Sequence, residues 1–212
     1  MLLDLVDALR CPEQHADIPL VATVHRRDGS EIMTGTLGCP ICGREYPVAG
    51  GAAYFGIDPG QRPAADELDM ESDREGEGEL AMRAGAFLAA SEGATLVLAG
   101  EWARAASALA TLVPVRVYAL NPPRGVSRNP GAVAVIHASR GIPLARGAAR
   151  GVALDHAATP AELASAARVI AAGGRLVAPA AAELPAGFVE LARDADHRVA
   201  ERLPPLVGIG RR

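Results

Sequence analysis

From residue 80 onwards, short apolar runs alternate along the chain with stretches in which apolar residues recur at helical spacing. The first pattern is typical of buried strands and the second of amphipathic helices. We expect strands over residues 95–99, 115–120, 133–136, 152–154 and 175–179, and two closing strands over 198–200 and 206–209. We expect helices over residues 79–91, 102–112, 160–172 and 188–194. This alternation predicts an α/β domain in which helices cover a largely parallel sheet.

The helix expected to begin at Pro160 has the clearest signals at its two ends. Thr159 is a favoured N-cap residue, and proline is favoured at the first helical position. We expect Gly173 and Gly174 to end this helix before the strand over 175–179.

The chain divides into three segments of different charge. Residues 1–57 carry four Arg against seven acids, a net charge of −3. Residues 58–79 carry two Arg and nine acids, a net charge of −7, and have the Pro and Gly content of a solvated linker. Residues 80–212 carry a net charge of +6. We expect a small N-terminal domain, an acidic linker and an α/β domain; the linker is either a flexible connector or docks on the basic domain.

Composition narrows the class of protein further. The chain has 212 residues, of which 50% are hydrophobic and 22% charged, and this excludes a disordered or collagen-like chain. Its start is apolar but has no basic residue ahead of two aspartates, unlike a signal peptide. No apolar run approaches the ~20 residues of a membrane-spanning helix. We expect a cytoplasmic protein with no membrane segment.

All three cysteines lie near the start of the chain, at positions 11, 39 and 42. An odd number of thiols argues against a disulfide framework, whereas Cys39 and Cys42 have the C-x2-C spacing of a zinc knuckle. Cys11 precedes a proline, as a second knuckle would, but the usual partner position, 14, is glutamine. His15 follows, and imidazole nitrogen is an ordinary zinc ligand. We therefore predict a four-ligand Zn²⁺ site of Cys11, His15, Cys39 and Cys42.

Other residues compete for the fourth position of this site. Glu13, Asp17 and His25 are the alternatives, although His25 lies in a strand-like run where a solvated face is expected. Three buried thiols without a metal are the remaining alternative. Four protein ligands leave no coordination position for a substrate, so the predicted zinc is structural. A segment this small is expected to rely on the metal to fold.

The N-terminal segment resembles a known family of zinc ribbons. The shared features are Leu2, Leu5, Leu9-x-Cys11-Pro12, Ile18-Pro19-Leu20 and the run from Cys39 to Gly51 with Tyr46-Pro47-Val48. The segment resembles the small zinc-ribbon activator subunit of tRNA and release-factor methyltransferases. It is also similar to the ribbon ahead of bacterial large-subunit rRNA guanine methyltransferases. The resemblance covers residues 2–56 and departs at His15, where a cysteine is usual.

Residues 80–212 resemble the class I S-adenosylmethionine-dependent methyltransferases. The features that carry this resemblance are a Pro-Leu loop at 142–145, the run Val152–His156, and the stretch 167–177 with its Gly-Gly turn. The resemblance implies a Rossmann-like methyltransferase fold, here preceded by the small zinc-ribbon domain.

The resemblance also implies where a cofactor would bind, and this part of the sequence departs from the family. The family's loop after the first strand is acid-x-Gly-x-Gly-x-Gly. Leu98 stands at the acid and only Gly100 survives of the glycines, while Trp102 and Arg104 are expected to fill the space of the methionine moiety. Asn121 stands near the position of the ribose-binding acid. Gly100 and Asn121 are therefore the remnants of a degenerate cofactor site.

The distribution of charge supports this interpretation. Residues 102–154 contain seven Arg and no acid, an unusual wall for a cationic sulfonium. Either the surface has drifted, or an anionic partner, with the acidic linker as the nearest candidate, docks there. Asp155 and His156 follow a strand where a catalytic pair is conceivable, but a helix cap or turn is favoured.

The sequence thus favours a pseudoenzyme that does not bind S-adenosylmethionine and acts as a scaffold or subunit with protein partners. No catalytic residue is assigned. Two alternatives stay open. One is an active S-adenosylmethionine-dependent methyltransferase, for which RNA is a candidate substrate; the other is a nucleic-acid-binding module that uses the arginines of 104–150.

Overall fold

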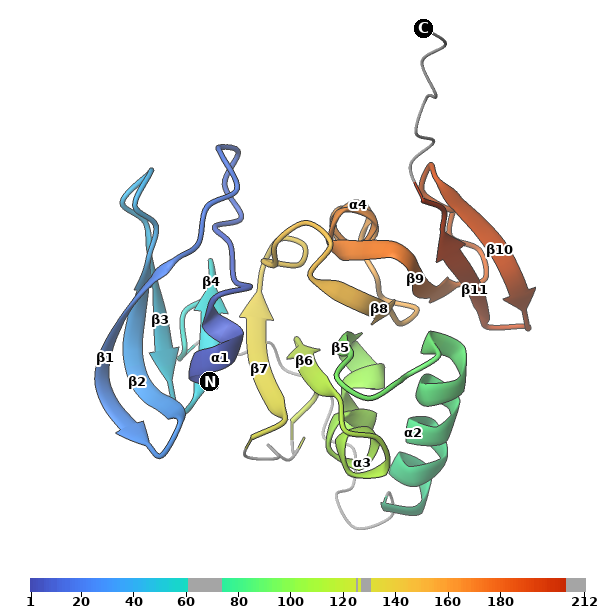
Figure 1. Cartoon of the computed structure of the whole chain (residues 1–212), viewed down its shortest axis with the longest axis horizontal. Coiled ribbons are helices and arrows are strands. Elements are labelled where there is room, and N and C mark those ends of the chain that lie inside the picture. Colours follow the sequence, from blue (N-terminus) through green and yellow to red (C-terminus); the bar gives the residue numbers. More distant parts are fainter. Residues whose placement is uncertain (61–73, 125, 127–130, 205–212) are drawn as a thin grey trace, which may run out of the picture.

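A mixed β-sheet organises the protein (Figure 1). The computed structural model describes residues 1–60, 74–124, 126 and 131–204. Within these residues the sheet has eleven strands, in the order β1-β2-β3-β4-β7-β6-β5-β8-β9-β11-β10.

The first four strands form an antiparallel meander. They are β1 (Val21–Asp28), β2 (Glu31–Gly38), β3 (Glu45–Ala49) and β4 (Ala52–Phe55). Gly50 and Gly51 connect β3 to β4, both with positive φ (56° and 80°). A two-residue hairpin of this kind requires that conformation at both positions, which glycine adopts without strain.

The central strands are parallel and buried. They are β5 (Thr95–Ala99), β6 (Arg116–Leu120), β7 (Val133–Ala138), β8 (Ala149–Ala153) and β9 (Ile170–Pro179). Beyond them lie two antiparallel strands, β10 (Phe188–Arg193) and β11 (His197–Arg202), with β11 between β9 and β10. Parallel central strands alternate along the chain with helices that cover the sheet, so the predicted α/β fold class is confirmed.

The N-terminal meander and the α/β part share one sheet. β4 pairs in parallel with β7, in a register that runs from Ala52 opposite Val135 to Phe55 opposite Ala138. Beside this junction, the hydroxyl of the buried Tyr118 donates a 2.7 Å hydrogen bond to the carbonyl of Leu5. One apolar core contains residues from both parts, and this shared core stabilises the N-terminal fold in addition to any bound metal.

Helices cover the two faces of the sheet. They are α1 (Leu3–Val6), α2 (Arg74–Leu88), the 3₁₀ helix η1 (Gly100–Ala105), α3 (Ala106–Leu112) and α4 (Pro160–Val169). α1 and α4 pack into the shared core, whereas α2, η1 and α3 pack on the opposite face (Figure 1). Alanines make up much of the second core, so the helices approach the sheet closely. No helix in the described part of the chain is long and apolar enough to span a membrane.

Two predicted elements differ from the structure. Residues 188–194 were predicted as helix but form β10, because pairing with β11 satisfies the backbone groups of this exposed segment. The helix at Pro160 has the predicted Thr159 cap and a full capping box, but it ends at Val169. Gly173, with φ of 71°, lies inside β9 near an irregularity in its pairing with β8. The strand predicted over 206–209 lies outside the described residues.

The segment between the two parts is only partly described. Residues 61–73, which carry most of the expected linker's acids, lie outside the described residues, so linker docking stays a prediction. α2 begins at Arg74 and includes the last residues of that segment.

Candidate metal centre and candidate cofactor pocket

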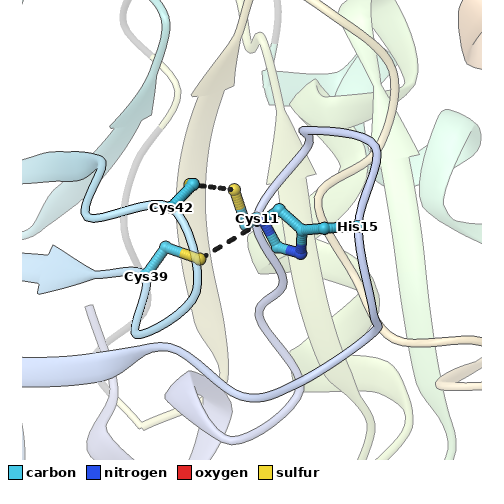
Figure 2. A group of neighbouring side chains, drawn as sticks. All are labelled: Cys11, His15, Cys39 and Cys42. Atoms are coloured by element: carbon cyan, nitrogen blue, oxygen red, sulfur yellow. Dashed lines mark hydrogen bonds between the residues drawn. The ribbon is translucent and has the colours of Figure 1, made fainter.

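Four side chains from two loops converge at one end of the meander (Figure 2). Cys11 and His15 lie in the loop after α1, and Cys39 and Cys42 lie in the turn between β2 and β3. One ligand atom from each of the four lies within 4.8 Å of every other. Positive φ at Gly43 and a hydrogen bond from its amide to the Cys39 carbonyl shape the turn. The structure therefore brings together the four residues that spacing predicted as ligands.

The distances within this cluster fit a tetrahedral ion. The sulfurs of Cys11 and Cys42 are 3.7 Å apart, and His15 Nε2 is 3.3 Å from the Cys39 sulfur. Two sulfurs bound to zinc at about 2.3 Å in tetrahedral geometry lie about 3.8 Å apart. The donor set of three thiols and one imidazole is an ordinary one for structural zinc, and the cluster is consistent with zinc binding.

The surroundings of His15 select the nitrogen that faces the thiols. Nδ1 of His15 lies 2.9 Å from the carbonyl oxygen of Ala16. A proton on Nδ1 satisfies this carbonyl and leaves the lone pair of Nε2 free to bind a metal.

Backbone groups favour the thiolate form of Cys39. Burial by itself raises the pKa of this thiol, but the backbone amides of Cys42 and Ile41 oppose that effect and lower the pKa to about 7. Since the thiolate is the metal-binding form, the turn favours metal binding at neutral pH.

Tyr46 supports the cluster, and sequence reasoning missed this role. Its hydroxyl lies 2.9 Å from the Cys11 sulfur, and its ring packs against Phe55 at 4.7 Å. Burial raises the pKa of Tyr46 above its usual range, so the phenol keeps its proton and donates to the sulfur. The one signal in the sequence was that Tyr46 belongs to the Tyr46-Pro47-Val48 run that carries the ribbon resemblance.

The three competing ligands have other positions. Glu13 pairs with Arg44 at 3.4 Å, and Asp17 pairs with Arg10 at 2.8 Å. His25 lies exposed in β1. Among the described residues, none of the three belongs to the metal-competent group.

A cavity of about 320 Å³ lies at the carboxyl ends of β5, β6 and β8, where open α/β sheets bind ligands. Both remnants of the expected cofactor site, Gly100 and Asn121, line it. The amide of Asn121 is used elsewhere: its nitrogen donates to the carbonyl of Ala138 (3.0 Å), and its oxygen accepts from the amide of Ala138 (2.8 Å). The side chain therefore ties the end of β6 to the end of β7.

Asp155 closes the loop that follows β5. One carboxylate oxygen accepts a hydrogen bond from the Glu101 amide (2.9 Å), and the other accepts from the Ala157 amide (2.9 Å). The carboxylate lies so close to Gly100, whose φ is 56°, that a Cβ there would collide with it. Asp155 thus forms the predicted turn and also a second contact that the sequence did not indicate; His156 does not line the cavity.

Two expectations about this cavity are wrong. Trp102 does not fill it: the indole is buried in the opposite core, against Phe87 (6.2 Å) and His197 (5.1 Å). The hydrophobic ring gains more from that core than from a polar cleft. Arg104 pairs with Glu101 at 3.6 Å and does not line the cavity.

None of the arginines in the described part of the arginine-rich window lines the cavity. Its charged lining residues are Glu101, Asp155 and Glu162. In the described part of the window, Arg116 begins β6 at the other end of the strand, and Arg150 donates to the carbonyl of Ala172.

Comparison with known proteins agrees with the N-terminal prediction. Residues 3–51 match the Trm112p-like protein family, which confirms the zinc-ribbon resemblance. No curated protein sequence matches the chain.

Solved structures with a similar arrangement include methyltransferases. A complex between the Haloferax volcanii Trm112 methyltransferase activator and a putative methyltransferase matches at 18% identity and a TM-score of 0.39, over 54% of this chain and 60% of that one. The [4+2]-cyclase SpnF matches at 14% identity and 0.41, over 52% and 48%. An S-adenosyl-L-methionine methyltransferase of Silicibacter pomeroyi DSS-3 matches at 15% and 0.40, over 66% and 99%. The chain thus spans less than two thirds of the first two proteins.

Proposed function

We propose that this protein is a non-catalytic subunit or scaffold of a larger complex, built from a zinc ribbon and a methyltransferase-like domain that does not bind S-adenosylmethionine. The observation that carries the proposal is the contact of Asp155 with the loop after β5. There the carboxylate of Asp155 accepts a hydrogen bond from the Glu101 amide and lies against Gly100.

The other groups that would hold the cofactor are also missing or engaged. Leu98, at the position of the family's acid, is fully buried in β5. Asn121 makes two hydrogen bonds to Ala138 and offers no carboxylate to a ribose diol. Binding in the family's manner would require at least the Asp155 contact to break, leaving an amide and a carboxylate to find new partners.

The ribbon's part in this proposal is structural. We assign Cys11, His15, Cys39 and Cys42 as the four ligands of one zinc ion. Four protein ligands close the coordination sphere, so the metal would lock the loop after α1 onto the β2–β3 turn and perform no chemistry on a substrate.

The surface supports a role in binding other proteins. The ribbon resembles a subunit that activates methyltransferases by association. At the edges of the sheet, β1 exposes Val21 and Val24, and β10 exposes Val189 and Leu191. Unpaired strand edges with apolar side chains are surfaces on which a partner can add a strand.

Calorimetric titration of the zinc-loaded full chain with S-adenosylmethionine tests the proposal. We expect no saturable heat for the wild type. Asp155→Ala, with Asp194→Ala as the control for loss of a carboxylate in a turn, tests whether the closing contact is responsible. A micromolar dissociation constant for the wild type would show that the domain is a cofactor-binding methyltransferase instead.

A further inference from the structure

A second cavity, of about 270 Å³, lies between the ribbon and the α/β part. Its lining comes from the loop that holds Cys11 and His15, and from Arg146 and Arg168 of the second part. It is separate from the candidate cofactor pocket, with which it shares no lining residue.

Positive charge dominates this cavity. Arg10, Arg146 and Arg168 line it, and Asp17 is the carboxylate nearest to them. Asp17 lies 2.8 Å from Arg10 and 3.9 Å from Arg168. The one other acid in the lining, Glu13, pairs with Arg44 outside the cavity. Three guanidinium groups against the carboxylates of Asp17 and Glu13 leave the lining with more positive than negative groups.

Backbone carbonyls hold the guanidinium groups of Arg168 and Arg10 in place, whereas the side chain of Arg146 is exposed. Burial lowers the pKa of Arg168; the Asp17 carboxylate opposes this effect, and the charges of Arg146 and Arg10 add to it. Arg168 donates to the carbonyls of Leu144 (2.5 Å) and Ile142 (2.9 Å). Arg10 is held in the same way by the carbonyl oxygens of its own loop.

These backbone contacts prepare the cavity for an anion. A guanidinium has more N–H donors than these bonds use, and donors fixed in advance lose little entropy when a ligand binds. Planar guanidinium groups match the oxygens of phosphate, and a bound anion would reduce the repulsion among the three positive charges.

We propose that this cavity binds the dianionic phosphate group of a small phosphate monoester, held by Arg10, Arg146 and Arg168. The proposal goes beyond the proposed function and does not depend on whether the second cavity binds S-adenosylmethionine. Bound phosphate would join the ribbon loop to α4 and so strengthen the contact between the two parts.

The test uses the zinc-loaded full chain, with inorganic phosphate as the probe in calorimetry and thermal unfolding. Arg146→Gln removes one charge and leaves the backbone in place, because Arg146 contacts Asp17 through its amide (3.3 Å). Arg140→Gln is the control, since Arg140 is an exposed arginine that does not line the cavity. Asp17→Asn removes the competing carboxylate.

We expect saturable phosphate binding by the wild type, weakened about tenfold or more by Arg146→Gln, because a charge-assisted hydrogen bond is lost. Arg140→Gln should bind like the wild type, and Asp17→Asn should bind more tightly. Sulfate should compete with phosphate. A parallel titration with glycerol phosphate shows which ligand the site prefers. Binding tighter than that of inorganic phosphate supports a phosphate monoester as the ligand, whereas equal or weaker binding shows that the site binds free phosphate and not a monoester. The proposal is overturned by absent binding, or by equal binding in the wild type and all three variants.

Discussion

Replacement of His15 by alanine should weaken zinc binding without unfolding the α/β domain. His15 is the ligand that departs from the usual ribbon pattern, and its Nε2 lies 3.3 Å from the Cys39 sulfur. His25→Ala is the matched control, because His25 is exposed in β1 and outside the cluster. His15→Cys replaces one zinc ligand with another and creates the four-cysteine set that is usual in such ribbons, so this variant should retain zinc.

The size of the effect follows from the geometry. Loss of a group that only orients a ligand weakens metal binding about 10–100-fold, so loss of the ligand itself should cost at least about 100-fold, or about 2.7 kcal/mol. Structural zinc contributes on the order of 10–16 kcal/mol, so a weaker site still forms. The core that α1 shares with the α/β part should keep the rest of the chain folded.

Competition with a chromophoric chelator measures the zinc affinity, and circular dichroism checks the fold. We expect the order wild type ≈ His25→Ala, then His15→Cys close behind, and His15→Ala far weaker. If His15→Ala holds zinc as tightly as His25→Ala, the fourth ligand is another residue and the assignment fails.

Two further substitutions test the packing. Tyr118→Phe should cost about 1–3 kcal/mol in thermal or urea unfolding, because a buried carbonyl of α1 loses its donor; an unchanged stability would show that the two parts are not coupled there. Gly100→Ala should cost at least about 2 kcal/mol, because its positive φ is strained for alanine and the added Cβ collides with Asp155. Gly29→Ala, with a φ of 55° and no neighbour near its Cβ, should cost only the strain of about 1 kcal/mol, and equal losses would contradict the closed loop.

The metal cluster could be found from the sequence because its chemistry is local. Cys39 and Cys42 share one turn, and Cys11 and His15 share one loop, so spacing alone indicated two ligand pairs. The contribution of Tyr46 depends on the register of β3 against β2, and no local pattern encodes that register.

For the fold, too, the sequence predicted the local elements but not the pairings that depend on distant strands. Apolar runs located the central strands, since a parallel strand is buried on both faces and reads as a continuous run. The prediction of a helix over 188–194 was wrong because the exposed side chains of this segment carry no decisive periodicity. Pairing with β11 determines its structure instead. The joint between β4 and β7 could not be foreseen, because an edge strand's sequence does not specify its partner.

At the candidate cofactor site, too, the sequence predicted some features and missed others. Missing glycines and acids predicted a degenerate site, and the prediction that Trp102 fills the cavity was wrong. Trp102 lies in the opposite core, and the side chain that contacts the loop after β5 is that of Asp155, which is distant in sequence from the Glu101 amide that it binds. The acids of the cavity lie just outside the arginine-rich window, so a count of charge along the chain did not reveal them.

The most direct measurement of the central claim is an amide NMR titration of the zinc-loaded protein with S-adenosylmethionine. The amides of Gly100 and Glu101 report on the loop that Asp155 closes. The account predicts that neither resonance shifts as the cofactor is added. Saturable shifts at both amides, at micromolar cofactor, would show that the loop opens to bind it and that the domain has kept its cofactor site.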